Sequence, residues 1–230
     1  MTNLKFETSP FDSLSSAYDT WFEDEGKAIF TIEVQAFQKV LPFLPKPWLE
    51  MGVGSGRFAQ ALGIENGLDP SIKLLDMAKN RGTNVFLGKG ESCPFKEATF
   101  GAVFLIITLC FVDSPLTTLR QTNRILRNNG KIVLGLILLE SPWGQFYQSK
   151  KERGHRFYKH ANFYNYDEVV RLLEGADFKV EKVLSTLYQL PEKVKHIESP
   201  QQGSSRSAGF TVIVAGKSSA LSLSNLNYTN

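Results

Sequence analysis

The chain has 230 residues, and 26 Lys and Arg against 23 Asp and Glu leave a formal net charge of +3. This charge is too small to indicate a surface for nucleic acid or for an anionic membrane. Aromatic residues make up 12% of the chain, which excludes a mainly disordered protein. Two cysteines exclude a disulfide scaffold and a four-thiolate zinc site, so we expect Cys93 and Cys110 to be free, partly buried thiols.

The chain shows neither a targeting signal nor a membrane segment. Its N-terminus lacks a basic stretch followed by an apolar one. The longest nearly apolar run, residues 102–112, is much shorter than the ~20 residues of a membrane helix. The three histidines and two cysteines do not fall at metal-ligand spacing. We therefore expect a cytoplasmic protein with no metal, no membrane partner and no nucleic-acid partner.

The first 45 residues are predicted to be helical. Their apolar face is made by aromatic side chains, namely Tyr18, Trp21, Phe22, Phe30 and Phe37.

The middle of the chain alternates strand-like and helix-like segments. Short apolar runs predict strands at residues 48–51, 67–69, 84–87, 102–107 and 132–139. Helices are expected between them at 57–62, at 71–81 and at 114–130, the last opened by Ser114-Pro115 and closed by Gly130. In the helix at 71–81, Ile72, Leu75 and Ala78 would share the buried face.

The last third of the chain changes character. Residues 141–166 are aromatic and basic without a clear period, and a short helix is expected at 167–174. Strands at 178–187 and 210–215, joined by a polar loop, predict an antiparallel hairpin at one sheet edge. The prediction is an α/β fold with a Rossmann-like, doubly wound, mostly parallel seven-stranded sheet and a C-terminal antiparallel hairpin. Residues 1–216 would be one domain, with caps at 1–45 and 141–166 and a flexible tail at 217–230.

The most informative segment is LEMGVGSGRFA, at residues 49–59. Gly52, Gly54 and Gly56 fall at a strand-to-helix turn, where glycine permits a positive φ and close approach of a ligand. The helix that follows directs free N–H groups into the same space. The spacing is G-x-G-x-G, and Arg57 stands where a dinucleotide site has its third glycine. A nucleoside without a diphosphate therefore fits better.

A carboxylate follows at the end of the second predicted strand. Asp69 is placed to accept hydrogen bonds from both hydroxyls of a ribose. It also precedes Pro70, so it could be the N-cap of the next helix with proline at N1. Both roles could hold at once.

Five segments together carry a resemblance to a known family. They are LEMGVGSGRFA, GLDPS, GESCPF, FGAVF and RILRNNGKIVLG. In this order they resemble the class I S-adenosylmethionine-dependent methyltransferases, and most of all the type 11, ubiquinone/menaquinone-biosynthesis-like subgroup. The resemblance spans about residues 18–215. It implies methyl transfer from S-adenosyl-L-methionine to a small-molecule acceptor, with S-adenosyl-L-homocysteine as product; the oligomeric state stays open.

The resemblance also implies a set of cofactor-binding residues. They are Glu50, Gly52, Gly54, Gly56, Asp69, Pro70, Leu74, Gly90, Glu91, Ile107 and Tyr18. Glu50 and the glycine loop would hold the methionine part, Asp69 the ribose, and Leu74 the adenine. The sequence departs from the family pattern at three places. Gly101 stands where Asp is usual, Lys89 where an acidic residue is common, and Arg127-Asn128-Asn129-Gly130 where Lys-Pro-Gly-Gly is usual.

Methyl transfer from a sulfonium releases a neutral thioether, so no general acid is required. The sequence accordingly shows no fixed catalytic signature. The aromatic segment at 141–166 is predicted to lie over the cofactor mouth, although a packed lid without chemistry is an open alternative. His155, Tyr158 and Tyr18 are weak candidates for a catalytic role, and His160 could also serve as a base.

Two other functions stay open at this stage. A nicotinamide-dependent oxidoreductase is disfavoured by the glycine spacing and by the lack of an obvious Ser, Tyr and Lys set. A non-catalytic relative that binds S-adenosylmethionine is compatible with the departures at Gly101 and Lys89.

Overall fold

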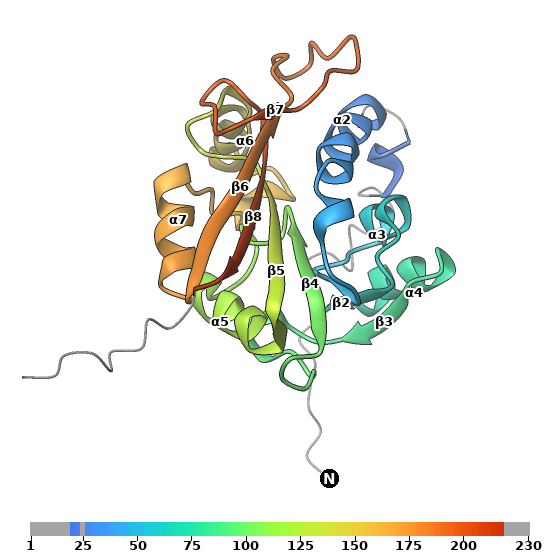
Figure 1. The fold of residues 1–230 in the computed structure, drawn as a ribbon. Helices are drawn as coiled ribbons and strands as arrows, with labels where there is room; N and C mark the ends of the chain where they lie inside the picture. Colours follow the sequence, from blue (N-terminus) through green and yellow to red (C-terminus); the bar gives the residue numbers. More distant parts are fainter. Residues whose placement is uncertain (1–18, 24–25, 219–230) are drawn as a thin grey trace, which may run out of the picture.

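A computed structural model describes residues 19–23 and 26–218 of the chain. It contains one eight-stranded sheet with the strand order β3-β2-β1-β4-β5-β8-β6-β7 (Figure 1). The strands are β1 (Trp48–Met51), β2 (Asn66–Asp69), β3 (Asn84–Leu87), β4 (Phe100–Ile106), β5 (Leu126–Leu136), β6 (Phe178–Thr186), β7 (Gln201–Gln202) and β8 (Phe210–Lys217). The first five strands are parallel, and β8 lies antiparallel between β5 and β6.

Helices cover both faces of the sheet. The α-helices are α2 (Lys27–Gln38), α3 (Arg57–Leu62), α4 (Ile72–Asn80), α5 (Pro115–Ile125), α6 (Pro142–Glu152) and α7 (Tyr166–Glu174). The 3-10 helices are η1 (Leu41–Phe43), η2 (Gly90–Ser92) and η3 (Tyr158–His160). One face packs against α2, α3 and α4, and the other against α5 and α7 (Figure 1). Every residue of the central strand β4 is buried, as its continuous apolar sequence predicts.

The predicted architecture is confirmed. The strand at 48–51, the helix at 57–62 and the antiparallel pairing of the last two long strands are all present. The predicted count of seven strands was one too low, because the polar loop after β6 contributes the two-residue strand β7. A strand this short and exposed has no apolar pattern that could reveal it.

Two details of the helix predictions were wrong. Ile72 is 56% exposed, and the buried residues of α4 are Leu74, Leu75 and Ala78. The helix predicted to end at Gly130 ends at Ile125, and Gly130 lies inside β5. Leu126 already pairs with Phe100 in β4, and this early pairing ends the helix.

A helix also lies in the segment that showed no period. Ser141 caps α6 by accepting a hydrogen bond from the Gly144 N–H at 2.9 Å, and Pro142 occupies its first turn. Only Trp143, Gly144 and Tyr147 of this helix are buried. Its weak amphipathic pattern explains why the period was missed.

Helix α2 runs from the carboxyl edge of the parallel strands towards their amino edge. Near its start, Phe30 packs on Phe58 of α3 with ring centroids 4.8 Å apart. Near its end, Phe37 packs on Phe104 and Phe210. Beyond α2, the Pro45 carbonyl lies where a side chain at position 101 would be. The unusual Gly101 is therefore required by the close approach of this connecting segment.

Across residues 19–23 and 26–218, no helix combines the length and the apolar character that a membrane crossing needs.

Both cysteines are free and buried, as predicted. Lys217, assigned to the tail, is the last residue of β8. Residues 219–230 of the tail lie outside the described residues, and so does Tyr18.

Candidate functional site

The glycine turn joins β1 to α3 at the carboxyl edge of the sheet. Gly52, Gly54 and Gly56 all have positive φ, at 79°, 52° and 82°. A Cβ atom at Gly56 would lie 2.8 Å from Ala78 Cα, and one at Gly52 would collide with the Thr108 side chain. Both the backbone conformation and the available space therefore require glycine at these two positions.

Asp69 is bound to this turn. Its Oδ2 accepts a hydrogen bond from the Gly54 N–H at 2.9 Å, and its Oδ1 accepts one from the Ser71 N–H at 2.8 Å. The N-cap of α4 is Ser71, whose Oγ accepts from the Leu74 N–H at 3.3 Å. The capping alternative for Asp69 was thus wrong by two residues. Asp69 instead ends β2 with its carboxylate against the glycine turn.

Glu50 lies below the turn with only 2% of its surface exposed. Its Oε2 is buried and has no hydrogen-bond partner. Burial, and then the negative charge of Asp69, raise the pKa of Glu50 well above its usual range. Glu50 lines a polar pocket whose other walls are Phe22, Gly52, Val53, Ser55, Arg57, Phe58 and Ile106. A cationic group entering this pocket would satisfy the buried carboxyl.

An ion-pair network ties the segment before α2 to this pocket. The Asp19 carboxylate accepts hydrogen bonds from Arg57 at 2.8 and 2.6 Å and from Arg81 at 2.7 Å. Arg81 also donates to the Ser55 carbonyl at 2.7 Å. Burial alone would raise the pKa of Asp19, but the hydrogen bonds from Arg57, Ser55 and Arg81 hold it below its usual range. Phe22, in the same segment as Asp19, is a wall of the pocket.

Four further expected cofactor residues follow β2 and β3 in the chain, namely Pro70, Leu74, Gly90 and Glu91. Leu74 is buried in α4, after Pro70. A Cβ atom at Gly90 would lie 2.9 Å from Met51 Sδ, so glycine is needed there too. The Glu91 Oε1 accepts hydrogen bonds from the Asp113 and Ser114 N–H groups, at 2.8 and 3.2 Å. Glu91 therefore holds the turn that leads into α5.

Lys89, which departs from the family pattern, lies beside this turn. Its Nζ is 3.1 Å from Asp113 Oδ2, and both side chains are more than half exposed. This exposed pair has little effect on stability.

The chain turns sharply where β4 ends. Ile107 has a φ of 50°, which is rare for a β-branched residue, and its N–H donates to the Gly135 carbonyl at 2.8 Å. Ile106 lines the polar pocket, whereas Ile107 lines a second pocket. Two consecutive residues at the end of β4 thus line different pockets, and Ile107 has the kind of strained backbone that functional sites retain.

The second pocket is apolar and partly aromatic. Its lining residues are Ile107, Cys110, Phe111, Leu136, Ile137, Leu138, Tyr158, Phe163, Tyr164 and Val169. Backbone hydrogen bonds hold the aromatic segment over the strand ends. The Asn162 N–H donates to the Cys110 carbonyl at 2.7 Å, and the Leu139 N–H donates to the Tyr164 carbonyl at 2.9 Å. The predicted insertion thus forms one wall of this pocket.

The three catalytic candidates fall in different places. Tyr158 lines the second pocket. His155 lies behind it, with ring centroids 4.9 Å apart, and lines neither pocket. Burial, together with Lys150 and Arg156, lowers the pKa of His155. Tyr18 lies outside the described residues, and His160 is exposed.

Sequence reasoning missed two acidic residues near the pockets. Asp19 pairs with arginines 38 and 62 positions away, so no local pattern reveals it. Glu33 is buried in α2 among apolar residues, and a lone acidic residue on such a face is the signal that could have found it.

Comparisons with known proteins agree with this geometry. Residues 49–134 match the family model described as a methyltransferase domain. An uncharacterized protein of Mycobacterium tuberculosis H37Rv is 38% identical over 87% of this chain and 71% of its own length. An uncharacterized protein of Methanocaldococcus jannaschii is 35% identical over 90% of this chain and 98% of its own length.

A solved structure points to the same family, and a more distant one shares the fold. A SAM-dependent methyltransferase of Thermotoga maritima, described as a possible histamine N-methyltransferase, is 33% identical with a TM-score of 0.85, covering 90% of this chain and 98% of that one. The CcbJ methyltransferase of Streptomyces caelestis, 16% identical with a TM-score of 0.64 over 92% of this chain and 99% of its own, shares the fold. The chain belongs to the class I S-adenosylmethionine-dependent methyltransferases, enzymes that use this cofactor and release S-adenosylhomocysteine.

Proposed function

We propose that this methyltransferase acts on a small-molecule acceptor bound in the second, apolar pocket. The observation that carries the proposal is at the end of β4, where Ile106 lines the polar pocket and the next residue, Ile107, lines the apolar one. A cofactor in the polar pocket and an acceptor in the apolar one would then meet at this strand end. Open α/β sheets bind their ligands at this edge.

The residues of the polar pocket fit the cofactor. Glu50 offers a buried carboxyl group, whose Oε2 has no hydrogen-bond partner, for the ammonium of the methionine part, and the glycine turn allows close approach. Asp69 would take the ribose hydroxyls. Pro70, Leu74, Gly90 and Glu91 are proposed to surround the adenine, with Tyr18 near the cofactor mouth. When bound, the cofactor supplies a methyl group on a positively charged sulfur.

The protein contributes alignment and the exclusion of water. Methyl transfer gains most from a nucleophile held in line with the reacting carbon and stripped of water. The apolar walls of the second pocket suit this task. Cys110 in that wall does not compete as a nucleophile, because burial raises the pKa of its thiol to about 12 and the reactive thiolate is scarce.

The segment over the strand ends supports a small acceptor. Residues 141–166 would act as the substrate cap and residues 1–45 as a second cap, within one domain of residues 1–216. The contacts of Asn162 and Tyr164 with the strand ends hold the first cap in place. An enclosed, partly aromatic pocket favours a flat organic molecule.

A labelled-methyl assay tests the proposal. The protein would be incubated with methyl-labelled cofactor and a panel of small amines, phenols and carboxylic acids. The panel includes histamine, because the Thermotoga maritima relative is described as a possible histamine N-methyltransferase. We expect label on at least one small molecule, and loss of that label when the larger side chain of Ile107→Trp fills part of the apolar pocket. Cofactor binding without any transfer would favour the non-catalytic relative instead.

A further inference from the structure

Glu33 is a buried carboxyl group with an oxygen that makes no hydrogen bond within the fold. Only 2% of its surface is exposed, and its Oε2 has no hydrogen-bond partner. It lies in the middle of α2, where its buried neighbours are Ile32, Val34, Ala36 and Phe37. A buried polar atom without a partner destabilises a protein, so its presence calls for an explanation.

The neighbours of Glu33 belong to the walls of both pockets or contact those walls. Residues three before and four after it share its helix face. Phe30 packs on Phe22 and Phe58, which both line the polar pocket. On the other side, Glu33 lies close enough to Tyr147 and Tyr158 to act on them electrostatically, and Tyr158 lines the apolar pocket.

The two tyrosines form a paired aromatic wall. Their ring centroids are 4.4 Å apart, and their side chains are hydrogen-bonded to each other. Burial is the main reason that the pKa of each is raised, and the charge of Glu33 adds to it. Because both hydroxyls therefore stay neutral, the wall presents ring faces and dipoles beside one carboxyl group.

We propose that Glu33 binds a positively charged nitrogen of the methyl acceptor, with Tyr147 and Tyr158 as the aromatic wall beside it. This inference rests on the proposed small-molecule methyl transfer. It narrows the acceptor to a flat or aromatic molecule that carries a basic amine or imidazole. A cation beside a carboxylate and aromatic rings is favoured by the ion pair and by the ring faces together. Methyl transfer would then occur at an atom that this contact aligns with the cofactor.

The physical state of Glu33 supports this role. Burial raises the pKa of Glu33 to about 8, so without a ligand the group is largely protonated at neutral pH. Arrival of a cation would favour the ionised form and give Oε2 its missing partner. Glu33 is therefore a binding and positioning residue whose charge appears with the acceptor.

Calorimetry on the protein saturated with S-adenosylhomocysteine tests the inference. The probes are two amines, phenethylamine and tryptamine, and their neutral counterparts, 2-phenylethanol and tryptophol. We expect at least one amine to bind more tightly than its alcohol. Glu33→Gln should weaken the binding of that amine by about 10- to 100-fold, the scale of a hydrogen bond to a charged group. The affinities for the alcohols and for S-adenosylhomocysteine should stay within about twofold of the wild-type values.

Infrared difference spectra give a second readout that a purely structural role would not move. Adding the amine to the wild-type complex should remove a protonated-carboxyl band, and Glu33→Gln should lack this change. The inference is overturned if no amine binds in preference to its alcohol, or if Glu33→Gln binds the amine as the wild type does. Failure to bind S-adenosylhomocysteine would instead contradict the proposed function, so the two failures are distinguishable.

Discussion

Asp19 and Arg57 form a two-pronged ion pair, with N–O distances of 2.8 and 2.6 Å, across 38 residues of sequence. Arg57 is the first residue of α3, where the positive end of a helix disfavours a cation. Asp19 therefore offsets an unfavourable charge and at the same time holds the segment before α2 against the polar pocket. Arg57 stands where dinucleotide sites have their third glycine, and here it anchors the segment before α2 through Asp19.

Asp19→Asn should weaken both the fold and the cofactor site. The substitution leaves Arg57 and Arg81 partly buried without their shared carboxylate. We expect a loss of about 2 kcal/mol in the free energy of unfolding, discounted for partial exposure. Affinity for S-adenosylhomocysteine should fall by about tenfold, because a wall of the pocket is released. Urea unfolding and calorimetry measure the two effects.

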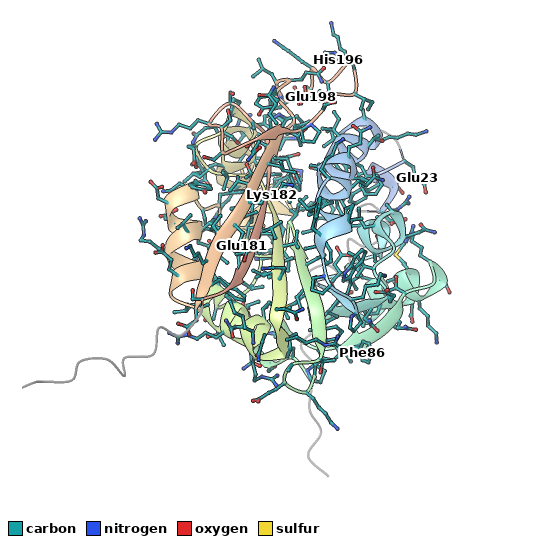
Figure 2. The ribbon with its side chains drawn as sticks, viewed as in Figure 1. Glu23, Phe86, Glu181, Lys182, His196 and Glu198 are labelled. Carbon is teal, nitrogen blue, oxygen red and sulfur yellow. The ribbon has the colours of Figure 1, made fainter. Side chains whose placement is uncertain are left out.

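Glu23→Gln is the matched control, because Glu23 also pairs with Arg57 but its side chain is 66% exposed. It lies on the outer side of the molecule, next to α2 (Figure 2). Glu23→Gln should change the free energy of unfolding by less than about 1 kcal/mol.

The pKa of Asp19 is lowered in the folded state, so the contribution of Asp19 to stability is present above pH ~4 and is lost on acidification. Equal stability of Asp19→Asn and wild type at neutral pH would refute the anchoring role.

Glu33→Gln should stabilise the ligand-free protein, and more so at higher pH. The pKa of Glu33 is raised from 4.5 to about 8 in the folded state, so the carboxyl is tolerated in acid and penalised as pH rises through that range. The buried groups that face it, Tyr147 and Tyr158, stay neutral throughout. The difference in unfolding free energy between variant and wild type should grow by a few kcal/mol between pH 5 and 8.

Thermal unfolding across this range, repeated for Glu33→Ala, measures the effect. Glu50, whose pKa is also raised, is unchanged in both proteins and cancels in the difference. A difference that stays flat with pH would show that Glu33 does not titrate as its burial requires.

Gly56→Ala should damage the cofactor site beyond its cost in backbone strain. Gly56 has a φ of 82°, and an added Cβ would lie 2.8 Å from Ala78 Cα and 2.9 Å from its Cβ. Helix α4 or the turn must therefore move. We expect a loss of more than 2 kcal/mol in unfolding free energy and at least about tenfold in S-adenosylhomocysteine affinity.

Gly63→Ala provides the comparison, because Gly63 has a φ of 68° with open space around it. It should cost about 1 kcal/mol from the backbone alone and leave affinity unchanged. If both variants lost affinity equally, strain at a glycine and not the shape of the turn would be the cause.

The parts of the fold and site that sequence revealed depend on local signals. The glycine turn needs its glycines whatever surrounds them, and the apolar run of β4 is buried on both faces as its composition predicts. Asp69 ends β2 and contacts Gly54, 15 positions earlier, because β1 and β2 are adjacent parallel strands whose carboxyl ends meet. Local signals and the order of the parallel strands were therefore enough for these elements.

The parts that sequence did not reveal depend on contacts between distant segments. The proximity of Glu33 to Tyr147 and Tyr158 requires α2, α6 and η3 to meet, and nothing near Glu33 in sequence indicates that meeting. Ile72 was assigned to the buried face because two faces of α4 carry apolar residues, and only packing selects Leu74 over Ile72. The helix α6 was hidden by lysines and glutamines that mix with its aromatic residues.

Titration calorimetry of S-adenosylhomocysteine, with Asp69→Asn beside wild type and the exposed-site variant Asp113→Asn as control, tests the central claim most directly. Asp69 contacts the glycine turn, whereas the Asp113 side chain is 79% exposed. We expect binding to the wild type, about 10- to 100-fold weaker binding to Asp69→Asn and unchanged affinity for Asp113→Asn. Absence of binding to the folded wild type, or equal affinity of Asp69→Asn, would contradict the central claim.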